Sequence, residues 1–139
     1  MTTISATTIV TGFTSEWDYE NRKTVRVPVV NEVKVGDFLS ETLVTDSIVW
    51  EVIKVTAKTV TVRSTKRGEA FQADTRCDKG AYGLEVMWEE QVSNPDGYTK
   101  SLRTRKDGTI RNGDHVGASP FYPTPTVDGK PARRVDYRF

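Results

Sequence analysis

The sequence predicts a mainly β, single-domain fold, a small SH3-like or OB-like barrel with long loops and a Pro-rich C-terminal extension. β-Branched residues alternate with polar ones from Ile48 to Arg63 on both sides of a short connection, which is typical of a β-hairpin. Turn signals such as Asn94-Pro95-Asp96-Gly97 separate further short alternating runs. Short strands joined in this way favour a small barrel.

The expected elements fall into three parts of one domain. Residues 1–30 form an N-terminal hairpin that turns near Asn21 and Arg22, and Pro28 makes its return run an edge strand. Residues 31–111 form the barrel core, with one hairpin over 48–63 and a second from Tyr98 through a turn at 106–108. Residues 112–139 are an extended tail, because they include Pro120, Pro123, Pro125 and Pro131, with a possible closing strand in RRVDYRF.

Two internal segments give weaker signals. Residues 64–81 show no stable period and are expected to form a long loop. The stretch LEVMWEEQV from Leu84 fits either one face of a helix or one face of a strand. The β-rich neighbours favour a strand there.

Length and composition indicate a folded intracellular protein. A chain of 139 residues is one ordinary domain, and its apolar fraction of 36% suits a folded chain with large loops. The single Cys77 leaves no internal disulfide, and the N-terminus has neither a basic region nor a long apolar core. We therefore expect a cytoplasmic location.

The residues that could carry catalysis are few. His115 is the only histidine and Cys77 the only cysteine, so a histidine-rich or cysteine-rich metal site is excluded. Glu89 and Glu90 are adjacent, and adjacent residues of a strand point to opposite faces. No glycine-rich phosphate loop is present. We expect a non-enzymatic protein with no metal and no cofactor.

Charge is uneven along the chain although the net charge is only +1. Cations gather in 54–67 and in 100–111, the two predicted hairpins, and a nucleic-acid-binding face needs cations beside aromatic rings. The candidate residues are Trp50, Lys54, Arg63, Lys66, Arg67, Arg103, Arg105, Lys106 and Arg111. Solvated charged faces without a ligand are the commoner alternative.

Trp50 decides whether the first hairpin offers a stacking surface. If Ile53 and Val55 pack with the return strand, the period of two places Trp50 on the opposite, solvated face beside Lys54. A bulge would instead turn Trp50 into the core, and strand aromatics are more often buried. Both interpretations stay open, with burial the more frequent outcome.

A protein partner is the alternative to nucleic acid. Five acids and one cation lie in 32–51, which would suit a basic partner. The Pro-rich tail would then present exposed anchors, because large aromatic side chains dominate interface energetics. These anchors are Phe121, Tyr122, Tyr137 and Phe139.

The segments VKVGDFL, VWEVIKVTAKTVTVR, GEAFQADTR, LRTRKDGTIR and ARRVDYRF carry a family resemblance. Over roughly residues 33 to 139 the chain resembles small accessory proteins of bacteriophages that infect actinobacteria. The resemblance implies a small SH3-like barrel, and either DNA transactions or binding of a host defence or replication factor. A minor virion structural role is a third possibility, and no site residues are implied.

Overall fold

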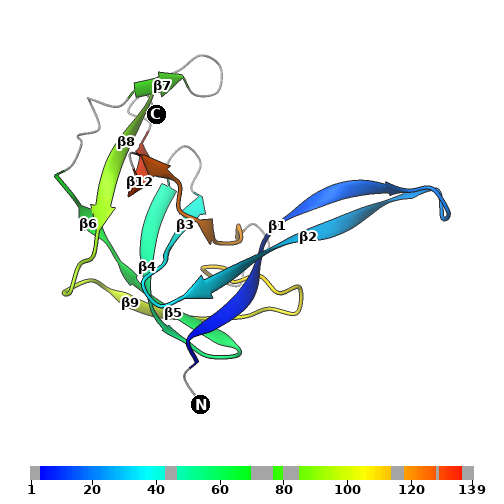
Figure 1. Ribbon diagram of the computed structural model, residues 1–139, viewed down its shortest axis with the longest axis horizontal. Coiled ribbons are helices and arrows are strands. Elements are labelled where there is room, and N and C mark those ends of the chain that lie inside the picture. The colour runs from blue at the N-terminus through cyan, green and yellow to red at the C-terminus, as the bar shows by residue number, and fades with distance from the viewer. Residues whose placement is uncertain are drawn as a thin grey trace.

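The computed structural model describes residues 4–42, 47–69, 77–79, 85–113, 118–127 and 129–135. For residues 77–79, 85–87 and 134–135 it describes the backbone alone. The regular elements in these ranges are all strands, in three antiparallel sheets, which confirms the mainly β prediction (Figure 1). Within these ranges there is no helix of the length and hydropathy needed to cross a membrane.

The first sheet is a two-stranded ribbon of β1 (Ala6–Asp18) and β2 (Lys23–Lys34). Its turn is fixed by the Asp18 carboxylate, which accepts hydrogen bonds from the amides of Glu20 and Asn21, and by Arg22 at φ 53°. The turn predicted near Asn21 and Arg22 is therefore confirmed. Figure 1 shows the ribbon projecting from the rest of the molecule as a long arm.

Only the proximal end of the arm belongs to the core. Ile9 and Val33 are buried there, and the Val10 amide donates to the Gly108 carbonyl at 2.9 Å. Beyond a register shift between Val10 and Gly12 the ribbon is exposed, and its end carries Trp17 and Tyr19, 51% and 84% exposed. A two-stranded ribbon without a covering layer is marginally stable, so the proximal contacts anchor the arm.

The second sheet holds most of the core. Its strand order is β10-β3-β4-β5-β9. The bounds are β3 (Phe38–Thr42), β4 (Ser47–Val55), β5 (Thr59–Ser64), β9 (Thr99–Arg103) and β10 (Tyr122–Pro123). The predicted hairpin over 48–63 is confirmed as β4 and β5, and the Asn94–Gly97 turn leads into β9.

A bulge in β4 decides the orientation of Trp50. The pairing of β4 with β5 shifts register between Val52 and Lys54, so that Val52 and Val55 both enter the core. Trp50 lies two residues before Val52, so it points to the same face of β4, and it is only 6% exposed. Trp50 therefore lies in the core and not on the solvated face that holds Lys54.

The third sheet lies beside the first residues of β4, where Arg133 donates to Ser47 O at 2.8 Å. Its order is β11-β12-β8-β6, and β7 pairs with β8 off this path. The bounds are β6 (Lys66–Arg67), β7 (Cys77–Lys79), β8 (Glu85–Val92), β11 (Thr126–Val127) and β12 (Lys130–Val135). The strand favoured over 84–92 is confirmed by β8 for 85–92, and Leu84 lies outside the described residues. The long loop predicted over 64–81 instead contains β6 and β7, which are too short to show a period.

The Pro-rich segment is part of the folded body and not an exposed tail. Phe121 is 0% exposed in the core, so the prediction that it is an exposed anchor is wrong. The cause is a set of long-range backbone bonds, from the Phe121 amide to Ile110 O and from the Thr124 amide to Phe38 O, both 3.0 Å. Tyr122 is half-buried, and the predicted anchors at 137 and 139 lie outside the described residues.

No sheet formed by the described strands closes on itself. The SH3-like or OB-like barrel is therefore not confirmed by this arrangement. What the structure shows is an arm and two five-stranded sheets, with the core cluster formed by the second sheet, the proximal arm and the residues Ile110 and Phe121.

Candidate nucleic-acid interface

The cations of the second predicted hairpin line one groove of about 760 Å³. Its walls are residues 100–106 together with Arg111 and Gly113. Five of these side chains are cationic, and no Asp or Glu is among the lining residues. The five are Lys100, Arg103, Arg105, Lys106 and Arg111.

The groove follows from the way the chain leaves β9. β9 is the last strand of its sheet, so its outer edge is unpaired by any other strand of that sheet. After it, the Arg105 amide donates to Thr109 O and the Gly108 amide to Arg105 O, both at 2.9 Å, with Gly108 at φ 86°. This tight turn brings residues 111–113 back beside the edge. The predicted return strand does not form, because Arg111 bridges to Pro120 instead.

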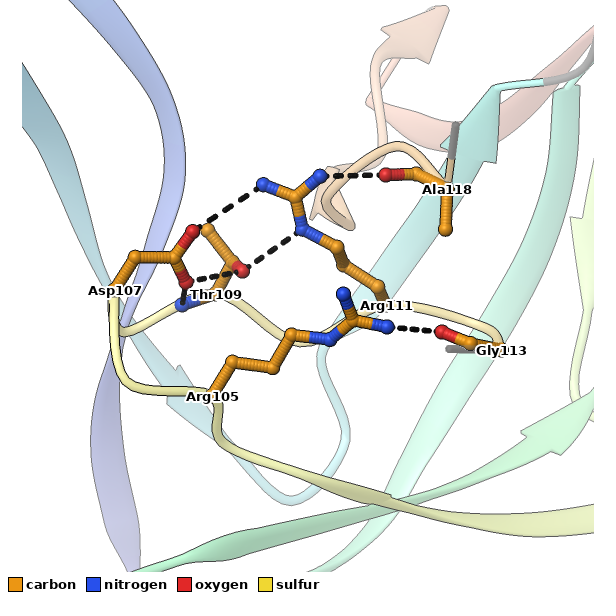
Figure 2. A network of polar contacts seen from close by, with 6 residues as sticks. All are labelled: Arg105, Asp107, Thr109, Arg111, Gly113 and Ala118. Carbon is orange, nitrogen blue, oxygen red and sulfur yellow. Dashed lines mark hydrogen bonds and ion pairs between the residues drawn. The ribbon is translucent and has the colours of Figure 1, made fainter. Parts of the chain in front are cut away.

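Arg111 is a structural clamp of this turn (Figure 2). Its Nε donates to Thr109 Oγ1 at 3.0 Å and its Nη1 to the Ala118 carbonyl at 2.5 Å. Its Nη2 lies 3.4 Å from Asp107 Oδ2. Because these donors are already engaged, Arg111 adds positive potential to the groove and stabilises its wall, and it is not expected to contact a ligand directly.

Lys100 and Arg105 are also held in place by protein acceptors. Arg105 donates to the Gly113 carbonyl (Figure 2). The Lys100 ammonium donates to Asn112 Oδ1, and the Asn112 amide donates to Glu41 Oε1 at 3.1 Å. These contacts join the two walls of the groove and fix the positions of both cations.

Arg103 and Lys106 are the cations that the groove leaves for a ligand. Both side chains are exposed, and neither has a hydrogen-bond or ion-pair partner within the part of the chain that the structure describes. A mobile exposed cation binds a phosphate without first giving up a protein partner. They are the residues most able to contact an anionic ligand.

The turn beneath the groove should respond to pH through Asp107. The Thr109 hydroxyl, donating to Oδ1 at 2.6 Å, is the largest cause that holds the pKa of Asp107 below its ordinary value, and the Thr109 amide, Arg111 and Arg105 add to it. Because the folded-state pKa is lowered, the stabilisation is fully present above the ordinary pKa of about 3.9 and is lost as the pH falls through the folded value.

Asp107→Asn is therefore expected to lower the free energy of unfolding by about 1 kcal/mol at about pH 7, the usual net value of a hydrogen bond. Urea denaturation at about pH 7 and about pH 3 measures the effect, which should shrink at the lower pH, because below the ordinary pKa of an aspartate the stabilisation from a lowered pKa is no longer fully present. Asp96→Asn, at an exposed turn carboxylate, is the control. An equal loss at both pH values would show that the Asp107 charge is not involved.

The cations of the first hairpin do not extend the groove. Arg63 pairs with Glu51 at 2.8 Å, and Glu51 also accepts from the Ser93 hydroxyl at 2.6 Å. Lys54 is exposed on the outer face of β4, where it pairs in register with Thr61. The patch predicted around Trp50 therefore keeps Lys54, Thr61 and Arg63 on one face but loses its aromatic residue.

Lys66 and Arg67 lie in the third sheet and line no part of the groove. Lys66 is exposed, whereas Arg67 is 3.5 Å from the buried Glu89 carboxylate. Glu89 also lies 3.4 Å from Arg133, and Glu90 lies 4.0 Å from Lys130. Both glutamates are thus engaged in ion pairs of the sheet.

The described residues contain no cluster of three metal-ligating side chains. Of the candidates considered for catalysis, His115 lies outside the described residues, and only the backbone of Cys77 is described. The structure therefore does not test whether Cys77 and His115 could take part in catalysis.

Tyr98 is an exposed aromatic that the sequence analysis did not select. It is 65% exposed directly before β9, and its ring lies 6.2 Å from the ring of the buried Trp50, at 56°. Its position directly after the Asn94–Gly97 turn was the only available signal. It lies two residues before Lys100, the first residue of the groove lining.

Comparison of the chain with protein-family models, with curated proteins and with solved structures found no match. No identity or activity therefore comes from a relative. The resemblance to accessory proteins of actinobacterial phages stays a prediction from the sequence. The groove and its cationic lining are the features that bear on function.

Proposed function

We propose that this protein is a non-enzymatic binding protein that holds nucleic acid in the cationic groove of residues 100–113. The observation that carries the proposal is the lining of that groove, which has five cations and no carboxylate. A cationic groove that follows a backbone is the general device for binding a nucleic-acid strand.

The charge acts locally and not through the whole protein. The net charge is +1, so long-range attraction to a polyanion is weak. Within the groove, Arg103 and Lys106 are exposed and have no partner in the described ranges, and the held cations beside them add positive potential. We therefore expect modest affinity with few phosphate contacts.

The proposal is consistent with the family resemblance. We propose, with that resemblance, a cytoplasmic accessory protein of a phage that acts on nucleic acid or on nucleic-acid machinery. An SH3-like or OB-like type of fold is part of this proposal, because small β folds of these types bind nucleic-acid strands on their faces and edges.

The test is a fluorescence-anisotropy titration of labelled single-stranded and double-stranded DNA and RNA at low salt. Micromolar binding is expected for at least one of these probes, since only a few phosphates are contacted. Absence of binding to every probe at low salt would overturn the proposal.

Protein binding is a second candidate, and the arm is the observation that favours it. The arm exposes Trp17 and Tyr19, whose rings lie 6.4 Å apart, and places Arg26 4.0 Å above the Phe13 ring. Trp, Tyr and Arg are the residues that dominate protein interfaces. A protein retained from an actinobacterial lysate by the wild type and lost with Trp17→Ser would favour this candidate.

A further inference from the structure

We infer that the groove takes a single strand of nucleic acid and that one unpaired base stacks on Tyr98. The inference rests on the proposed function, and it adds a ligand class and a specific contact residue. It replaces Trp50 by Tyr98 as the stacking aromatic, because Trp50 is buried whereas Tyr98, whose ring lies 6.2 Å from that of Trp50, is exposed.

Tyr98 has the position that a stacking residue needs. Its side chain is 65% exposed, and it lies two residues before Lys100, the first lining residue of the groove. Consecutive bases of a single strand are about as far apart as alternate residues of a β-strand, so a backbone held by the groove cations can place a base on Tyr98.

Tyr98 is also held rigidly. Its amide donates to Ser64 Oγ at 2.8 Å, and its carbonyl accepts from the Ser64 amide at 2.8 Å. The preceding Gly97 packs so closely that an added Cβ would lie 2.4 Å from Ser64 O. These bonds fix the backbone of Tyr98, so ordering that backbone adds no cost when a base binds.

A continuous chain of contacts connects this ring to the groove. Trp50 Nε1 donates to Glu41 Oε1 at 3.0 Å, and the same oxygen accepts from Asn112, which in turn accepts from Lys100. The stacking ring and a groove cation are thus positioned by one network. Duplex nucleic acid hides its base faces within the stack, so this arrangement favours a single strand.

Tyr98→Ala tests the inference, with a labelled oligothymidylate of about 12 nucleotides, within the usual site size, as the probe. Affinity is expected to fall about 5- to 100-fold while the slope of log affinity against log salt stays the same, because stacking contacts no phosphate. Tyr98→Phe should keep wild-type affinity, since the ring remains. Tyr19→Ala, at an exposed tyrosine on the arm, is the matched control and should have no effect.

The outcomes separate this inference from the proposed function. Wild-type affinity in Tyr98→Ala, together with weakened binding in Arg103→Glu, overturns the stacking role and leaves groove binding in place. Wild-type affinity in both variants overturns both. Equal affinity of the wild type for the single strand and for its duplex would also overturn the inference. Thermal unfolding of each variant, with Tyr98→Phe as reference, shows whether a loss comes from unfolding.

Discussion

Phe121→Ala is expected to lower the free energy of unfolding by about 3–5 kcal/mol, the usual cost of truncating a fully buried aromatic side chain. Phe121 is 0% exposed and belongs to the core cluster with Ile110, Leu39 and Val52. Its loss would leave a cavity where the Pro-rich segment joins the second sheet. Chemical denaturation monitored by far-ultraviolet circular dichroism measures the change.

Tyr122→Ala is the control for this experiment. Tyr122 is the next residue, half-buried on β10, and pairs with Ser40 of β3. Its truncation should cost about 1 kcal/mol, because less area is buried. If Phe121→Ala cost no more than Tyr122→Ala, the Pro-rich segment would not be packed in the core as described.

Reversing both free groove cations, Arg103→Glu with Lys106→Glu, is expected to weaken binding of a single strand at least about 100-fold at low salt. The change removes two phosphate contacts and sets two carboxylates against the strand at a short distance. Screening at high salt should reduce the difference between variant and wild type, since both side chains are exposed. Anisotropy titrations of the two proteins in parallel measure it.

A charge-matched variant separates local from global effects. Lys23→Glu with Lys34→Glu makes the same change in net charge, from +1 to −3, at two exposed lysines of the arm. If the groove is the site, this variant should bind within about threefold of the wild type, because neither lysine lines the groove and exposed charges are screened by salt. A comparable loss in both variants would mean that binding depends only on net charge.

The two hairpins of the N-terminal half could be predicted because their signals are local. The alternation over 48–63 and the turn residues near Asn21 and Arg22 specify paired strands without reference to the rest of the chain. The orientation of Trp50 could not be predicted, because it depends on the bulge between Val52 and Lys54. A bulge is selected by the packing of both neighbouring strands and leaves no distinct mark in the sequence.

The Pro-rich segment shows a second limit of sequence patterns. Around Pro120, Pro123 and Pro125 the regular elements are short, since β10 and β11 are only two residues each, but Pro131 lies within the six-residue strand β12. Composition does not tell where such a segment packs. The backbone bonds from Phe121 and Thr124 to Ile110 and Phe38 join distant parts of the chain, and they bury the aromatic that the sequence placed outside.

The candidate site could be predicted only in part, because its local turn is visible in the sequence but its long-range contacts are not. Lys106-Asp107-Gly108 is a local turn signal, so the gathering of cations in 100–111 followed from the sequence. Which of them stay available depends on tertiary contacts. Arg63 is paired across strands with Glu51, and Arg111 reaches Ala118, so neither is free. Tyr98 was missed because it lies outside the alternating runs, directly after a turn, where exposure depends on tertiary packing.

The salt dependence of binding tests the central claim most directly. The wild type is titrated with a labelled single strand at several salt concentrations, and log affinity is plotted against log salt. Two contacts, from Arg103 and Lys106, predict a slope of about −1.4, at roughly −0.7 per phosphate. A slope near zero, or no binding at low salt, would contradict a phosphate-binding groove.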